Sequence, residues 1–98
     1  GAKSKSAAIQ ISDLEQALEL YKLDVGKFPA RDEGLNALVR QPSGVTGWNG
    51  PYLKKGEVPD DPWGNPYEYR YSGGMPEIVS YGADGRSGGS GEDADVTG

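Results

Sequence analysis

The sequence predicts an α+β domain, with a long N-terminal helix packed on a small antiparallel sheet and an acidic C-terminal loop. Three observations lead to this prediction: an apolar stripe with helical spacing, a strictly alternating run of tyrosines, and a glycine-rich ending that contains several carboxylates. Because the helix comes first and the strands follow, the order is typical of α+β proteins. At 98 residues the chain has the usual size of a single domain, residues 1–98.

The first element is expected to be a helix over residues 1–25, which Gly26 ends. Its apolar residues recur at intervals of four and three, so they form one stripe on a helix. The stripe consists of Ala7, Ile11, Leu14, Leu18, Tyr21 and Val25, and Ala17 and Leu20 are expected to widen it. Ser12 and Glu15 form a capping-box pattern that would start a shorter helix, but the stripe passes through Ser12 without changing phase. We expect the sheet to cover the C-terminal half of the stripe, while Ala7 and Ile11 project beyond the domain toward neighbouring molecules.

Residues 26–65 are expected to form a short helix and loops. The helix is predicted at Arg31–Val39, and a turn-rich loop then leads to a brief strand near Tyr52–Leu53. The adjacent carboxylates Asp60 and Asp61 lie in a segment that two prolines hold extended, where consecutive side chains point opposite ways. We therefore assign this pair to turn and cap roles rather than to acid–base catalysis.

Residues 66–81 are expected to form a β-hairpin. Tyrosines at 67, 69 and 71 alternate with charged residues, which predicts a strand buried on one face. Gly73-Gly74 supplies the turn, and the segment "PEIVSY" returns as the partner strand.

The composition excludes several classes of function. The chain has no cysteine and no histidine, so thiolate chemistry, imidazole ligation and Ser-His-Asp catalysis are absent. We assign no catalytic residue and predict that the protein is not an enzyme. A net charge of −5 without a basic stripe argues against a nucleic-acid partner. Any metal here must be held by oxygen atoms, as calcium and magnesium are.

Residues 82–98 form an acidic, glycine-rich segment with two interpretations. Asp84, Asp93 and Asp95 could hold calcium, because the glycines between them let the chain curl back and turn its carbonyl groups inward. Alternatively, a segment of Gly, Ser and Asp without apolar anchors is typical of a disordered tail. The spacing of an EF-hand loop is absent, and a single match to the calcium-binding β-helix nonapeptide lacks the stacked copies which that site needs.

The order of several motifs resembles the major pseudopilin family of the type II secretion system, the general secretion pathway protein G family. The motifs are "ALELYKLD", "FP", "GLNALV", "WNGPYLKK", "VPDDPWGNPYEY" and "SYGADGRSGGSGEDADV". This resemblance covers nearly the whole chain and implies a pilin-like fold. It implies a structural subunit of the pseudopilus, which helps to drive folded exoproteins across the outer membrane. The alternatives are a stand-alone calcium-stabilised binding module and a minor pilin.

The resemblance also implies a calcium ion in the C-terminal loop. Asp84, Asp93 and Asp95 would supply side-chain ligands, with backbone oxygens from around Tyr81 and Ser87. Relatives often continue past the "DAD" motif with an Ile and a Trp, where this chain has Val-Thr-Gly.

The remaining implications concern location and partners. Family members carry a methylated N-terminus and an apolar helical segment that anchors them in the inner membrane, with the rest in the periplasm. We expect this chain to be the soluble periplasmic part, monomeric by itself because it is acidic. The full-length protein is expected to assemble with itself, with minor pseudopilins and with other secretion components.

Overall fold

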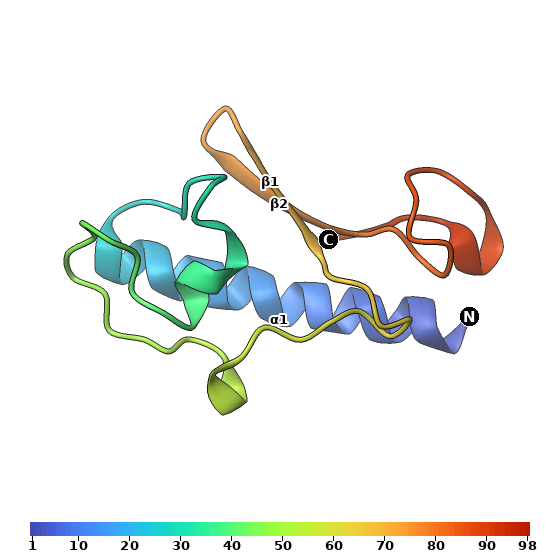
Figure 1. The fold of residues 1–98 in the computed structure, drawn as a ribbon, viewed down its shortest axis with the longest axis horizontal. Helices are drawn as coiled ribbons and strands as arrows, with labels where there is room; N and C mark the ends of the chain where they lie inside the picture. Colours follow the sequence, from blue (N-terminus) through green and yellow to red (C-terminus); the bar gives the residue numbers. More distant parts are fainter.

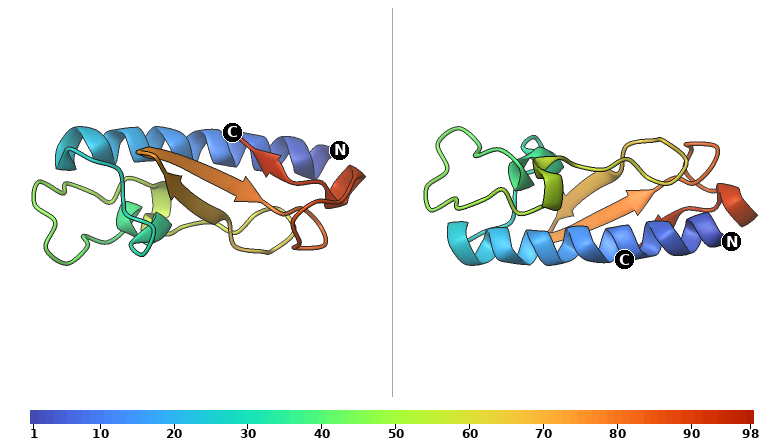
Figure 2. Two further views of the ribbon diagram at one scale, coloured as in Figure 1. Left: turned by 90° about the horizontal axis from the view of Figure 1, so that it is seen from above. Right: turned by 90° about the horizontal axis from the view of Figure 1, so that it is seen from below.

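The structure is a computed structural model that describes all residues from 1 to 98. One long helix, α1 (Ala2–Val25), lies along the molecule, and a small sheet crosses it at an angle (Figure 1). The loops of the middle region pack beside the C-terminal half of α1, and the C-terminal loop lies by its first turns (Figure 2). The molecule measures 42 × 29 × 17 Å. None of its helices combines the length and the apolar character needed to cross a membrane.

The predicted long helix is confirmed. α1 passes through Ser12 without interruption, so the capping-box pattern does not start it. It ends at Gly26, whose φ of 96° is left-handed and whose N–H donates to the Lys22 carbonyl at 2.8 Å. Glycine adopts this conformation without a Cβ clash, which is why it terminates the helix here. The apolar stripe forms the core-facing side of α1, with Leu14, Leu18 and Tyr21 fully buried.

The expectation that Ala7 and Ile11 project beyond the domain is wrong. Both side chains are 0% exposed, and Ile11 belongs to the main hydrophobic core. The reason is a third strand, β3 (Val96–Thr97), which was not predicted and which packs beside α1. The chain end continues along the helix, so that Gly98 lies against the carboxylate of Glu15. The C-terminus therefore covers the part of the stripe that the hairpin does not reach.

The middle region is more irregular than predicted. The expected helix at Arg31–Val39 is a short 3-10 helix, η1 (Gly34–Leu38). No strand forms at Tyr52–Leu53, and a second 3-10 turn, η2 (Lys54–Gly56), follows instead. The Tyr52 N–H is satisfied by the Leu38 carbonyl at 2.7 Å rather than by a neighbouring strand. A single bond to the end of η1 thus replaces the pairing that a strand would need.

The predicted hairpin is confirmed as β1 (Glu68–Ser72) and β2 (Met75–Ser80). The sheet is antiparallel with the order β1-β2-β3, and Val79 and Ser80 pair with Thr97 and Val96. Gly73 and Gly74 have φ angles of 60° and 79°, the positive values that a tight two-residue hairpin turn requires. The three alternating tyrosines face the core, as expected.

Candidate functional site

The C-terminal loop starts from a buried polar anchor, the carboxylate of Asp61. This side chain is only 4% exposed. Its Oδ1 accepts hydrogen bonds from the N–H groups of Trp63 at 3.1 Å and Asn65 at 2.8 Å, so it holds the turn that follows it. Its Oδ2 accepts the Ser80 hydroxyl at 2.7 Å. Every buried oxygen of this carboxylate is therefore satisfied, and the turn is fastened to the end of β2.

This anchor positions the first residues of the loop. The Ser80 Oγ also accepts the N–H of Gly82 at 3.2 Å, which links Asp61 to the point where the chain leaves the sheet. The side chain of Asn65 lies against Gly85, where a Cβ atom would approach its Nδ2 to 3.4 Å. The predicted turn and cap role therefore describes Asp61, whereas Asp60 is exposed.

The C-terminal segment folds back on itself and closes at its base. The Ala83 N–H donates to the Glu92 carbonyl at 2.7 Å, joining the outgoing and returning arms. Gly82, with φ of 78°, is so close to the returning arm that a Cβ there would lie 2.7 Å from the Ala94 carbonyl oxygen. Only glycine fits such an approach. The loop thus has a defined fold, with a 3-10 turn, η3 (Gly91–Asp93), on its returning arm.

Two of the three predicted aspartates lie beside the same pair of glycines. A Cβ on Gly89 would lie 2.9 Å from the Cβ of Asp93, and both carboxylate oxygens of Asp95 accept the Gly88 N–H at 3.1 Å. Asp84 stays on the outgoing arm, where its Oδ1 accepts the Arg86 N–H at 3.1 Å in a local turn.

The two backbone positions taken from the family resemblance also lie at this loop. The Tyr81 side chain turns away, toward the hairpin, where its hydroxyl accepts a hydrogen bond from Arg70 at 2.9 Å. The main-chain carbonyl oxygen is therefore the only atom of Tyr81 that could serve as a metal ligand in the loop. Ser87 is exposed at the loop's tip.

The donor chemistry of the loop fits a hard cation, although its carboxylates are not gathered. No three acidic side chains lie close enough together to hold a metal ion as they stand. The groups around the loop are carboxylate and carbonyl oxygens, which calcium prefers, and the chain contains neither thiolate nor imidazole to attract a softer metal. A cation would therefore need the three carboxylates to move closer together.

Glu92 connects the loop to the first turn of α1. Its carboxylate accepts the Ser4 hydroxyl at 3.4 Å. Nearby, the buried Tyr67 hydroxyl donates to the side chain of Gln10. Burial raises the pKa of the Tyr67 hydroxyl above its ordinary value, so the group remains a donor. The loop and the hairpin are thus both fastened to the N-terminal half of α1.

A second candidate surface lies on the outer side of α1. Ile9, Leu20 and Leu23 are 64%, 50% and 80% exposed. The expectation that Leu20 widens the buried stripe is therefore wrong, because the spacing of these three residues places them on the opposite side of the helix. Leu20 borders a groove of 490 Å³, whose other wall contains Lys54 and Lys55. Exposed apolar residues on one helix side are typical of a protein contact.

Comparison with known proteins gives one consistent family. The profile of the family described as Type II secretion system (T2SS), protein G matches residues 1–98. The type II secretion system core protein G of Pseudomonas aeruginosa is 46% identical over 101 residues, which cover 97% of this chain and 70% of that protein. The Xanthomonas campestris protein of the same name is 44% identical, over 96% of this chain and 64% of that protein. This chain spans about two thirds of the length of these relatives.

Among solved structures, the fold is similar to the major pseudopilin from the type 2 secretion system of enterohaemorrhagic Escherichia coli. The TM-score is 0.81 at 29% sequence identity, and the likeness covers 98% of this chain and 82% of that chain.

Proposed function

The chain belongs to the protein G family of the type II secretion system, the pseudopilins, and we propose that it polymerises into the fibre that helps to drive folded exoproteins across the outer membrane. In this proposal the protein is a structural subunit and catalyses no reaction. The full-length protein is anchored in the inner membrane with this domain in the periplasm. It assembles with copies of itself and with minor pseudopilins.

The observation that carries the assembly proposal is the exposed apolar side of α1. Ile9, Leu20 and Leu23 make no contribution to the domain's own core, which lies on the opposite side of the helix. Leaving large apolar side chains in water is unfavourable, and burying each one against a neighbour would stabilise the fibre by about 1.5–3 kcal/mol. This surface therefore supports packing between helices of adjacent subunits.

The experiment combines Leu20→Glu and Leu23→Glu in the full-length protein. We expect the double variant to fold normally, because both residues are exposed, but to lose fibre formation and secretion. Met75→Glu is the matched control, since Met75 is 69% exposed at the tip of the hairpin, beside Glu19 of α1 and not on the side of the helix that carries Leu20 and Leu23. Fibres are measured by electron microscopy of sheared material. Normal fibres from the double variant would refute the role of this surface.

We further propose that the C-terminal loop binds calcium through Asp84, Asp93 and Asp95, with backbone oxygens of Tyr81 and Ser87. Support comes from the closed base of the loop, from its oxygen donors and from the placement of Asp93 and Asp95 beside the same glycines. When bound, calcium would neutralise the carboxylates and join the two arms of the loop. Because the returning arm leads directly into β3, the ion would also hold the strand that covers Ile11.

A further inference from the structure

β1 is the outer strand of the sheet, and its outward edge has no backbone partner. The order β1-β2-β3 leaves β1 paired on one side only. None of the backbone hydrogen bonds that lie outside the helices and strands involves a residue of β1. Such an edge presents a row of unpaired N–H and C=O groups to another chain.

The register identifies which backbone groups point outward. Tyr71 lies opposite Pro76, which has no N–H to donate, and Tyr69 lies opposite Ile78. In an antiparallel ladder, opposite residues alternate between pairs that exchange two hydrogen bonds and pairs that exchange none. The Tyr71–Pro76 and Tyr69–Ile78 pairs are of the second kind. The N–H and C=O groups of Tyr69 and Tyr71 therefore face away from β2.

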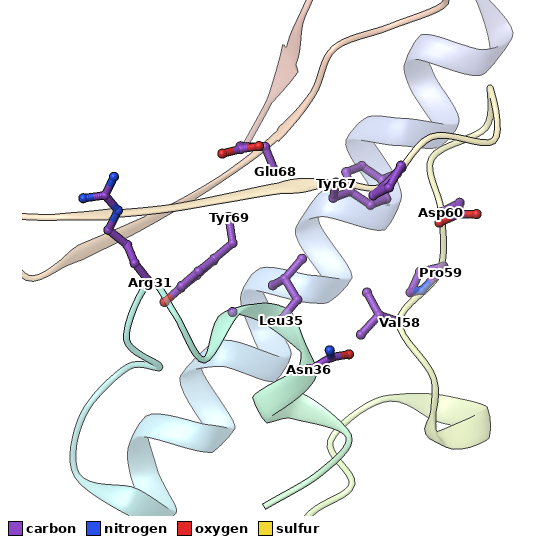
Figure 3. Close-up of a pocket in the computed structure, with 11 residues that line it drawn as sticks. Arg31, Leu35, Asn36, Val58, Pro59, Asp60, Tyr67, Glu68 and Tyr69 are labelled. Carbon is purple, nitrogen blue, oxygen red and sulfur yellow. The ribbon is translucent and has the colours of Figure 1, made fainter. Parts of the chain in front are cut away.

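A pocket of 270 Å³ opens beside the start of this edge (Figure 3). One wall is the chain from Pro66 to Tyr69, and the opposite wall is the extended segment from Val58 to Asp60. Leu35 of η1 lies between them, below Tyr67 and beside Tyr69 in the view of Figure 3. The pocket is on the core-facing side of β1, where an added strand would direct every second side chain.

The charges around the edge favour a basic occupant. Glu68 and Asp60 line the pocket, both are exposed, and neither forms an ion pair. Arg31 is the only basic residue of the pocket, and Arg70 is already paired with Glu77 at 3.5 Å. A second copy of this chain is a less suitable occupant of this edge, because its net charge of −5 adds to the negative charge of Glu68 and Asp60, and contact between copies in the fibre is proposed through α1 instead.

We propose that the outward edge of β1 binds an extended, basic segment of another polypeptide as an added antiparallel strand. The segment's backbone exchanges hydrogen bonds with Tyr69 and Tyr71, as in other strand-addition interfaces. An apolar side chain opposite Tyr67 enters the pocket, and the neighbouring basic side chain lies opposite Glu68. The recognised pattern is therefore a lysine or arginine flanked by apolar residues. This site is separate from both the calcium loop and the exposed side of α1.

The probe is a synthetic peptide, acetyl-Lys-Val-Thr-Val-Lys-Leu-amide, titrated into the chain. Binding should slow the hydrogen exchange of the Tyr69 and Tyr71 amides, measured by NMR. Two N-methylated versions of the peptide test backbone recognition. In each version, methyl groups block the N–H groups along one of the two edges of the extended peptide. One version should lose binding and the other should retain it. Equal binding of both versions, or no protection of the two amides by the parent peptide, would overturn the proposal.

Glu68→Lys tests the charge requirement against Glu19→Lys, a matched change at an exposed position on α1 that gives the same net charge. Glu68→Lys should weaken peptide binding about fivefold or more, since it replaces an attraction with a repulsion. Glu19→Lys should have a much smaller effect, and equal effects would refute the site. If protection of the Tyr69 amide instead rises with protein concentration alone, and sedimentation shows dimers, then the occupant is a second copy and the proposal is wrong.

Discussion

Replacing Ile11 with alanine should destabilise the domain far more than the same change at Ile9, two residues away. Ile11 is 0% exposed within the core, whereas Ile9 is 64% exposed on the other side of α1. Truncation to alanine removes three carbon groups, each contributing about 0.8 kcal/mol when buried, so the loss is about 2.4 kcal/mol before any cavity forms. The cavity left under β3 adds to this, and the expected destabilisation is about 2–5 kcal/mol.

Urea denaturation followed by circular dichroism measures both variants. A loss of about 3 kcal/mol would be a large share of the total stability of a domain this size, and would lower the Tm by about 12–24 °C. Ile9→Ala should change the free energy of unfolding by no more than about 0.5 kcal/mol, as exposed substitutions do. Equal effects at the two positions would refute the conclusion that the C-terminal strand covers the N-terminal half of the helix.

Three further perturbations test the packing around the C-terminal loop. Ser80→Ala removes the hydroxyl that satisfies the buried Asp61 carboxylate, and should cost about 1–3 kcal/mol in urea denaturation. Gly89→Ala would place a Cβ 2.7 Å from a backbone oxygen, so the loop should open and proteolysis there should accelerate. Gly88→Ala, at a similar positive φ but in open space, should do so much less. Burial raises the pKa of the Tyr67 hydroxyl, so the unfolded chain releases that proton first. Stability should be full below about pH 10 and should fall as the pH rises above it, less steeply in Tyr67→Phe.

The sequence predicts the elements whose signals are local. α1 follows from a repeat of apolar residues that one helix satisfies by itself, and the hairpin follows from alternating tyrosines joined by two glycines. In both elements, the spacing of the apolar residues along the sequence places them on the one side of the helix or strand that faces the core. The α+β order was therefore readable without any knowledge of distant contacts.

The elements that sequence reasoning missed depend on contacts between distant residues. β3 has only two residues, too few for any periodic signal, and it exists because Val79 and Ser80 are available to pair with it. The burial of Ile11 follows from β3 and was missed for the same reason. At Tyr52, propensity favoured a strand, but the N–H found its partner at the end of η1.

The candidate site was predictable only in part. The spacing of Asp93 and Asp95 indicated that both side chains could serve one loop, and they do lie beside adjacent glycines. Spacing does not determine the distance between the outgoing arm and the returning arm, so it could not predict where Asp84 lies. The bond between Asp61 and Ser80 joins residues 19 positions apart and has no local signature.

The proposal that calcium completes the fold is tested most directly by thermal unfolding with calcium, with magnesium and with a chelator. A ligand that binds only the folded chain adds about 2.7 kcal/mol at a hundredfold excess over its Kd, which corresponds to a rise in Tm of about 10–20 °C. We expect calcium to give this rise, magnesium to give less, and Asp84→Ala or Asp93→Ala to abolish it while Asp60→Ala does not. Superimposable unfolding curves with calcium and with chelator would contradict the account, and the acidic loop would then have to be stable through its own hydrogen bonds.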